Sequence, residues 1–299
     1  METRKIVRLL IFIFLFLSVF FGYLYVDEYT SKNVLSEDFV SSAIENLNGI
    51  GIEVDNGAIE TFVPEKDIYV FGIASDEAYY KTISDTIIDT CLYDDVLKIS
   101  FDVPDGASFG FYDAHESEKE LGRIVFSSSD MAFSFYKNTI NVSGGNEPEF
   151  SGDLTKVDKN MEKIVDKFAS SISTGSRCSY RICGFSGDEE LSVVSVTQTV
   201  DGYDITNAFI NFVFLDNELV KVAGKWMVSE PKAKYHEVLC DGVNAIYNLK
   251  LDNVEKIHSQ RIVYSMRKSD ADKFFLVPGW EIVYTDKRGA LIREFADAI

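Results

Sequence analysis

The chain has 299 residues, of which 46% are hydrophobic, and its 23 Phe and 15 Tyr provide the material for a folded core rather than a disordered chain. Its formal net charge of −19 at pH 7 repels nucleic acid and anionic lipid headgroups, so we expect neither of these as a partner. None of the three His residues has the zinc-ligand spacing from the four Cys residues, so we expect no metal site.

The first predicted element is a membrane-spanning helix at residues 9–26, a run without charged side chains between Arg8 and Asp27. A helix of about 18 residues is roughly 27 Å long, close to the hydrocarbon thickness of a bilayer. The basic residues that precede the run predict a cytoplasmic tail at residues 1–8 and an extracellular location for everything after the span. A cleaved signal peptide is the alternative, but the bulky residues at 20–26 do not suit a peptidase.

Within this run, Ser18 and Gly22 lie four residues apart and therefore on one face of the helix. Small residues let the backbones of two membrane helices approach closely, which is what drives their association in lipid. Phe14 and Phe21 flank the same face. We therefore expect these four residues to contact a partner helix within a single-pass protein of the cell membrane.

The next part of the chain, residues 27–150, is predicted to form an N-terminal α+β extracellular domain. Ser36 has the character of a helix N-cap, and the apolar face that follows it ends at Gly49 and Gly51. Residues 68–136 are predicted to be rich in strands, because apolar and polar residues alternate cleanly at 97–103. A linker is expected at residues 143–152, which are rich in Gly, Asn, Glu and Pro.

Residues 151–299 are predicted to form a second extracellular α+β domain, in which helices pack on antiparallel sheets. Helices are expected at 155–172, from its apolar stripe, and from Ser229-Glu230-Pro231 to about Leu249, because Ser can cap a helix and Pro suits its first turn. Strands are expected at 218–228, 257–266, 275–284 and 290–295. We expect Trp226 and Trp280 to be buried in these sheets.

Cys178 and Cys183 are five residues apart in the sequence C-S-Y-R-I-C, where they would flank a tight hairpin. A disulfide between them is one candidate pairing, but sequence alone does not fix the connectivity of the four cysteines.

No catalytic or cofactor-binding motif stands out in the sequence. It contains no G-x-S-x-G nucleophile elbow and neither of the glycine-rich patterns that hold phosphates. His115, His236 and His258 are isolated from one another, and we interpret each as a structural residue. We therefore expect no catalytic residues, no cofactor and no enzymatic activity.

Five segments of the C-terminal part carry a resemblance in their order and spacing, although none of them is specific alone. The first two are predicted strands, Val196–Tyr203, which contains a Gln and closes in a Gly-aromatic turn, and Asn207–Phe214. The next two are the triplet Gly224–Trp226 and the predicted helix start Ser229–Lys232. The last is a strand with the pattern Pro-x-Trp-x-Ile, Leu276–Ile282. Residues 190–299, together with the single N-terminal span, resemble the YycI family of membrane-anchored accessory proteins. These proteins serve the cell-wall-regulating histidine kinase of low-GC Gram-positive bacteria. The cysteines and Gly279 depart from the family pattern.

The resemblance implies a regulator without catalysis. Such a protein would act with a YycH-like membrane protein and would contact the sensor histidine kinase through membrane helices and extracellular surfaces. Whether the chain forms a homodimer or a heterodimer is left open. The alternatives are an extracellular cell-wall hydrolase, whose carboxylates would be hidden among the many surface acids, and an ectodomain that binds a peptide or a protease.

Overall fold

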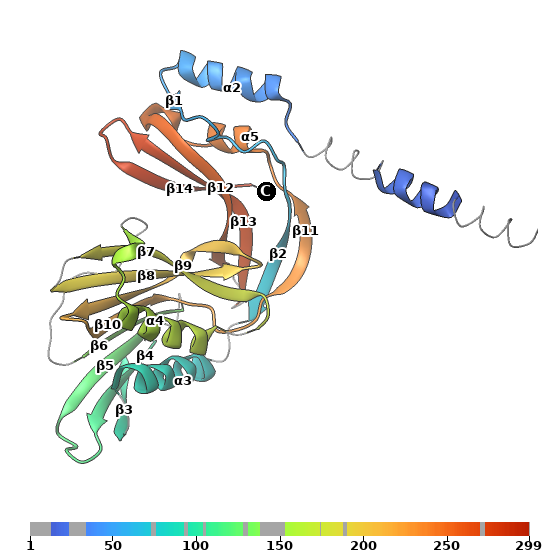
Figure 1. Ribbon diagram of the computed structural model, residues 1–299. Coiled ribbons are helices and arrows are strands. Elements are labelled where there is room, and N and C mark those ends of the chain that lie inside the picture. The colour runs from blue at the N-terminus through green and yellow to red at the C-terminus, as the bar shows by residue number, and fades with distance from the viewer. Residues whose placement is uncertain are drawn as a thin grey trace, which may run out of the picture. The chain divides into compact units, whose positions relative to one another are not determined.

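The computed structural model describes residues 13–23, 34–72, 76–92, 95–103, 106–127, 131–137, 153–173, 175–187, 190–269 and 273–298. The fold is mixed α+β and is dominated by antiparallel strands (Figure 1), which confirms the predicted class. The chain divides into two compact units. Unit 1 comprises Met1–Lys66, Val238–Arg261 and Trp280–Ile299, and unit 2 comprises Asp67–Glu237 and Ile262–Gly279.

The helices and strands are named below with the labels of Figure 1. The helical segments are α2 (Glu37–Gly49), α3 (Asp76–Ile87), the π-helix η1 (Ile88–Leu92), the 3-10 helix η2 (Leu154–Lys156), α4 (Lys159–Ile172), α5 (Gly242–Tyr247) and the 3-10 helix η3 (Leu251–Asn253). The strands are β1 (Glu53–Val54), β2 (Glu65–Gly72), β3 (Val96–Val103), β4 (Gly106–Asp113), β5 (Glu120–Ser127), β6 (Ala132–Lys137), β7 (Cys178–Gly187), β8 (Leu191–Val200), β9 (Tyr203–Leu215), β10 (Glu218–Lys225), β11 (Lys232–Val238), β12 (Val254–Lys268), β13 (Lys273–Asp286) and β14 (Leu291–Asp297).

Unit 1 is built from segments that lie far apart in the sequence. Its helix α2 begins where predicted, because the Ser36 hydroxyl accepts a hydrogen bond from the Phe39 backbone N–H at 3.2 Å. The short strand β1 pairs in parallel with the start of β12. The apolar core of this unit gathers buried side chains from both ends of the chain: Ala43, Leu47, Ile52, Leu239, Val243, Ile246, Ile257, Trp280 and Ile282.

Unit 2 contains an antiparallel sheet with the strand order β3-β4-β5-β6-β10-β9-β8-β7. Helices α3 and α4 contact each other and lie along this sheet (Figure 1). The predicted apolar stripe of α4 is buried, with Met161, Val165 and Phe168 among its members. Phe168 packs edge-on against Phe212 of β9, with ring centroids 5.3 Å apart, so this helix closes the core over the central strands.

Both tryptophans are fully buried, as predicted, but their indole N–H groups differ. The Trp280 N–H donates to the Cys240 carbonyl at 2.9 Å within unit 1. The Trp226 N–H, in unit 2, has no hydrogen-bond partner among the described residues. A buried donor without a partner carries a free-energy cost that the packing of the ring must offset.

Two predicted segments differ in the structure. Residues 76–87 form the helix α3 inside the region predicted to be strand-rich, and Tyr79, Ile83 and Ile87 form its buried stripe. The helix predicted from Pro231 to about Leu249 is wrong. Its first half is the exposed strand β11, a neighbour of β2, and only Gly242–Tyr247 is helical, capped by the Asp241 side chain.

The two compact units also divide the chain differently from the predicted domains 27–150 and 151–299. Strand β6 hydrogen-bonds with β10, with Phe135 opposite Val222, so residues on both sides of position 150 share one sheet. The predicted linker at 143–152 lies outside the described residues.

The predicted membrane span is described only in its central part, as a helix at residues 13–23. Its apolar residues are exposed, with Phe14 71% accessible. Of the helices in the described ranges, none combines the length and the apolar character needed to cross a membrane. Both ends of the predicted span at 9–26 fall outside these ranges.

Candidate functional site

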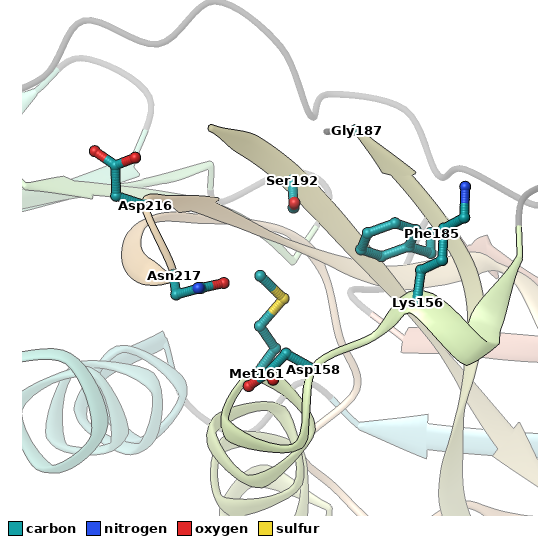
Figure 2. Close-up of a pocket in the computed structure, with 8 residues that line it drawn as sticks. All are labelled: Lys156, Asp158, Met161, Phe185, Gly187, Ser192, Asp216 and Asn217. Atoms are coloured by element: carbon teal, nitrogen blue, oxygen red, sulfur yellow. The ribbon is translucent and has the colours of Figure 1, made fainter. Parts of the chain in front are cut away.

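A pocket of about 790 Å³ lies in unit 2, where the start of α4 meets the ends of three sheet strands (Figure 2). The residues that line it come from η2 and α4, from the end of β7, from the start of β8 and from the turn between β9 and β10. They are Lys156, Asp158, Met161, Phe185, Gly187, Ser192, Asp216 and Asn217. The volume is within the usual range of small-ligand sites.

The helical wall of the pocket is positioned by two caps. The Asp158 carboxylate accepts a hydrogen bond from the Asn160 backbone N–H at 2.7 Å and so begins α4. The Asp153 carboxylate begins η2 in the same way, through the N–H and the hydroxyl of Thr155, and these bonds lower the pKa of Asp153. As a result, Met161 points from the first turn of α4 into the pocket (Figure 2).

The opposite wall is the tight turn between β9 and β10. Asp216 and Asn217 both have positive φ, 50° and 64°, which suits a two-residue hairpin turn and residue types that tolerate the left-handed region. The Asp216 N–H donates to the Glu190 carbonyl at 2.8 Å and ties this turn to the start of β8. Figure 2 shows the Asn217 amide directed toward Met161 and the Asp216 carboxylate turned away from the pocket.

The lining combines a buried apolar floor with a polar rim. Met161 and Phe185 are buried, while Lys156 and Asn217 are exposed. The lining residues include no His or Cys, and the Asp158 carboxylate is already engaged as a cap. This chemistry suits the binding of an apolar side chain that carries a polar neighbour, as in a peptide.

A smaller hollow of about 190 Å³ shares Asp216 and Asn217 with the pocket and reaches the π-helix η1. Thr90 and Cys91 of η1 line it, and the buried Thr90 hydroxyl has no hydrogen-bond partner among the described atoms. Burial raises the pKa of the Cys91 thiol to about 12, so this cysteine is protonated at neutral pH and is a poor nucleophile.

The four residues predicted to contact a partner helix all lie in the described helix 13–23. At about 3.6 residues per turn, Phe14, Phe21 and Gly22 fall on the same side as Ser18. Phe16 and Phe20 lie on the opposite side and stack on each other, with centroids 6.3 Å apart. The predicted contact itself involves a partner and stays a prediction.

The structure does not bring Cys178 and Cys183 together. Both lie on the single strand β7, not on two arms of a hairpin, and neither forms a disulfide. Five residues of a strand span roughly 16 Å, whereas a disulfide needs Cα atoms within about 7 Å. The candidate disulfide is therefore wrong, because the segment C-S-Y-R-I-C is extended.

Sequence reasoning missed one constellation around His258 in unit 1. The His258 Nδ1 lies 2.9 Å from Asp55 Oδ2, and its Nε2 lies 2.7 Å from the Thr285 hydroxyl. Lys256 also contacts Asp55 at 2.8 Å, and the hydrogen bonds from Lys256 and His258 lower the pKa of Asp55. No local signal predicts this grouping, because its members come from three distant strands or turns.

The other two histidines also have carboxylate neighbours. His236 lies on β11 rather than on the predicted helix and contacts Asp67 at 2.8 Å. His115 lies in an exposed loop, as predicted, near Asp95. Within the described ranges, His, Cys, Asp and Glu side chains form no group of three or more that is placed to hold a metal ion.

Comparisons with known proteins find structural neighbours, two of which align at low sequence identity. No protein-family model matches the chain, and no curated protein matches it. An uncharacterized protein from Eubacterium rectale aligns with a TM-score of 0.49 and 8% identity, over 83% of this chain and 87% of that one. The C-terminal domain of Bacillus megaterium YpeB aligns with a TM-score of 0.37 and 12% identity, over 76% of this chain and 93% of that one. These similarities are too weak to assign a function.

Proposed function

We propose that this protein is a membrane-anchored, non-catalytic accessory regulator of a sensor histidine kinase that controls cell-wall homeostasis. It would act together with a YycH-like membrane protein, through contacts of its membrane helix and its extracellular part. The resemblance of residues 190–299 to the YycI family and the uncharged run at 9–26 support this proposal. Neither requires the chain to turn over a substrate.

The observation that carries the proposal is the asymmetry of the helix at residues 13–23. One side bears the Phe16–Phe20 stack, and the other bears the two small residues Ser18 and Gly22 between Phe14 and Phe21. A Cβ atom added at Gly22 would meet no other atom within 4 Å, so this position is open to a neighbouring helix. In lipid, close backbone approach over small residues is what favours helix association.

Two residues of the segments that carry the family resemblance, Gln198 and Gly224, have a structural role within unit 2. The buried Gln198 amide donates to the Met227 carbonyl at 2.8 Å and accepts from the Met227 N–H at 3.0 Å. A Cβ at Gly224 would lie 2.0 Å from the Phe209 carbonyl oxygen, so glycine permits the close pairing of β10 with β9. Gln198 and Gly224 are therefore engaged inside the fold, and we do not propose them as partner contacts.

A regulator of this kind works only through differential affinity. If it binds one signalling state of the kinase ten times more tightly than the other, it shifts their ratio by up to tenfold, about 1.4 kcal/mol. The sign of the shift depends on which kinase state the two helices fit.

The test is co-purification of a histidine kinase with the full chain from native membranes. We expect Ser18→Leu with Gly22→Leu to reduce kinase recovery roughly tenfold and to alter reporter output, because Leu side chains separate the two backbones. Phe16→Leu with Phe20→Leu is the matched control on the opposite side of the helix and should change little. Equal recovery with both double variants, at equal membrane insertion, would place the contact outside the helix.

A peptide-binding ectodomain is the second candidate, and the pocket of Figure 2 favours it. Its apolar floor of Met161 and Phe185 beside polar rim groups suits a short peptide segment. Met161→Glu would place a charge on that floor. Loss of binding to a peptide library in this variant, with kinase co-purification unchanged, would separate the two functions.

A further inference from the structure

Among the described residues, strand β3 is the last strand of the sheet in unit 2. Within the described ranges it pairs with β4 alone and ends the strand order of the sheet. It runs for eight residues, V-L-K-I-S-F-D-V, without a proline or a bulge in its pairing with β4. Proteins usually blunt such an edge with prolines, bulges or several charges, because its free backbone groups can pair with another strand.

The side chains of β3 have two different faces. Lys98 lies on the side of α3, with its Nζ 4.1 Å above the Phe109 ring, which in turn packs on Tyr80 of that helix. Leu97 and Ile99 point to the other side, and each is 44% exposed. Apolar side chains that gather on one exposed face are typical of an interaction surface.

The exposed face continues across the neighbouring strands, since directly paired residues of a sheet share a face. Ile99 is paired with Gly110, Gly110 with Arg123, and Arg123 with Tyr136, which is itself exposed. The rings of Phe101 and Tyr112 cover Gly110, where an added Cβ would lie 2.9 Å and 2.8 Å from them. Arg123 lies 4.9 Å from the Phe101 ring centre. These contacts hold the face in one arrangement before any partner arrives.

We propose that β3 pairs antiparallel with β3 of a second copy of this chain, in the register that sets Ser100 opposite Ser100. The register follows from the sequence of the strand. It sets Lys98 opposite residue 102 of the second copy, which is an aspartate, twice per dimer. It also sets Ile99 opposite Phe101, so the apolar faces of the two sheets become one.

Other registers also keep the apolar faces on the same side, but they do not place opposite charges across from each other. Centring the pair on residue 98 sets lysine opposite lysine, and centring it on residue 102 sets aspartate opposite aspartate. Like charges that face each other across strands are destabilising, whereas opposite charges stabilise the pair. The strand is therefore self-complementary in one register. This inference does not rest on the proposed regulation of a kinase.

The first experiment is cross-linking of the full chain in native membranes with a short bismaleimide, in a Cys240→Ser background that removes the partly exposed thiol. Ser100→Cys lies on the two-fold axis of the proposed dimer and should cross-link efficiently to itself. Leu97→Cys is the matched control on the same strand. In the proposed register its two copies lie roughly 20 Å apart, six residues along the strand, and should not cross-link.

The second experiment exchanges the two charges in the Ser100→Cys chain. Lys98→Asp alone and Asp102→Lys alone each set like charges opposite each other and should lower the cross-linked fraction roughly tenfold. The double exchange restores opposite charges and should recover most of the cross-linking. A variant that merely misfolds would not be rescued by the second change.

Three results would overturn the proposal. One is the absence of a Ser100→Cys dimer in membranes that contain folded protein. Another is cross-linking of Leu97→Cys as efficient as that of Ser100→Cys, which would contradict the register. The third is an adduct of Ser100→Cys with a different protein, which would show that β3 is covered by a heterologous strand rather than by a second copy.

Discussion

In the sheet of unit 2, residues paired directly across neighbouring strands form a row that runs from the central strands to β3. The polarity and the exposure of the residues differ between the centre and the outer end of this row. At the centre, the row carries Ser195 and Asn211, which are fully buried and joined by a hydrogen bond of 2.7 Å. It passes through Ala223, Ser134, Val125 and Ser108 and ends at Phe101 on β3. At this outer end, the same face exposes the neighbouring apolar side chains of Leu97 and Ile99.

This row reverses the usual distribution of polar and apolar residues. Buried polar groups are tolerated at the centre because they bond to each other, and they fix how β8 and β9 pair. The exposed apolar groups at the outer end contribute little to the fold of the free chain. We therefore expect the central strands to stabilise the fold and the outer strands to contact a partner.

The largest effect expected from this comparison is the removal of a large central side chain. Trp226→Ala should lower the free energy of unfolding by about 3–5 kcal/mol, because it leaves a cavity beside β10. Tyr136→Ala, on the exposed face of β6, should cost less than about 1 kcal/mol. Urea unfolding of the full chain measures both values, and similar losses in the two variants would contradict the division of roles. Trp280→Ala should show a comparably large loss in unit 1.

The next effect concerns the buried polar pair. Asn211→Ala removes the oxygen that accepts the Ser195 hydroxyl and should cost about 1–3 kcal/mol. Ser134→Ala lies on the same row but is half-buried, and it should change stability by less than about 0.5 kcal/mol. The double variant Ser195→Ala with Asn211→Ala should lose less than the sum of the two single losses, and strict additivity in thermal melts would argue against the pair.

A smaller effect separates the two tryptophans. Trp280→Phe loses the hydrogen bond to the Cys240 carbonyl, whereas Trp226→Phe removes a donor that has no partner within the described residues. Because the change in ring size is the same, the first variant should be less stable than the second by about 1 kcal/mol. Chemical denaturation of both proteins measures this difference, which should vanish if an ordered water satisfies the Trp226 N–H.

The smallest expected effect on stability is at the outer end. Thr is common in strands, so Leu97→Thr and Ile99→Thr should change the free energy of unfolding by less than about 0.5 kcal/mol. In the proposed dimer, however, both should weaken self-association. Analytical ultracentrifugation of the detergent-solubilised chain checks this, and a large loss of stability would mean that these side chains belong to the core.

The sequence was a good guide where local periodicity decides the structure. The apolar stripe of α4 and the alternation in β3 are visible in the sequence, and so are the cap at Ser36 and the last three strands. The stripe Tyr79, Ile83 and Ile87 of α3 was also available and was overlooked in a region full of strand signals.

Other features depend on contacts between distant parts of the chain. The segment Lys232–Val238 has no clear strand period and is extended because it lies beside β2, so tertiary pairing overrides its helical preference. The pocket joins residues near 158, 187 and 217, which only the register of β7, β8, β9 and β10 brings together. The turn residues Asp216-Asn217 were the one local signal for its position.

The parallel pairing of β1 with β12 has a consequence for how the protein is made. Glu53 pairs opposite Lys256, and β14, the last strand of the same unit, ends at Asp297. A ribosome adds roughly 5–20 residues per second, so the first strand waits on the order of 10–40 seconds for its neighbour. Unit 1 can therefore close only after almost the whole chain has been synthesised. Until then its N-terminal segments are exposed to pairing with the wrong chain.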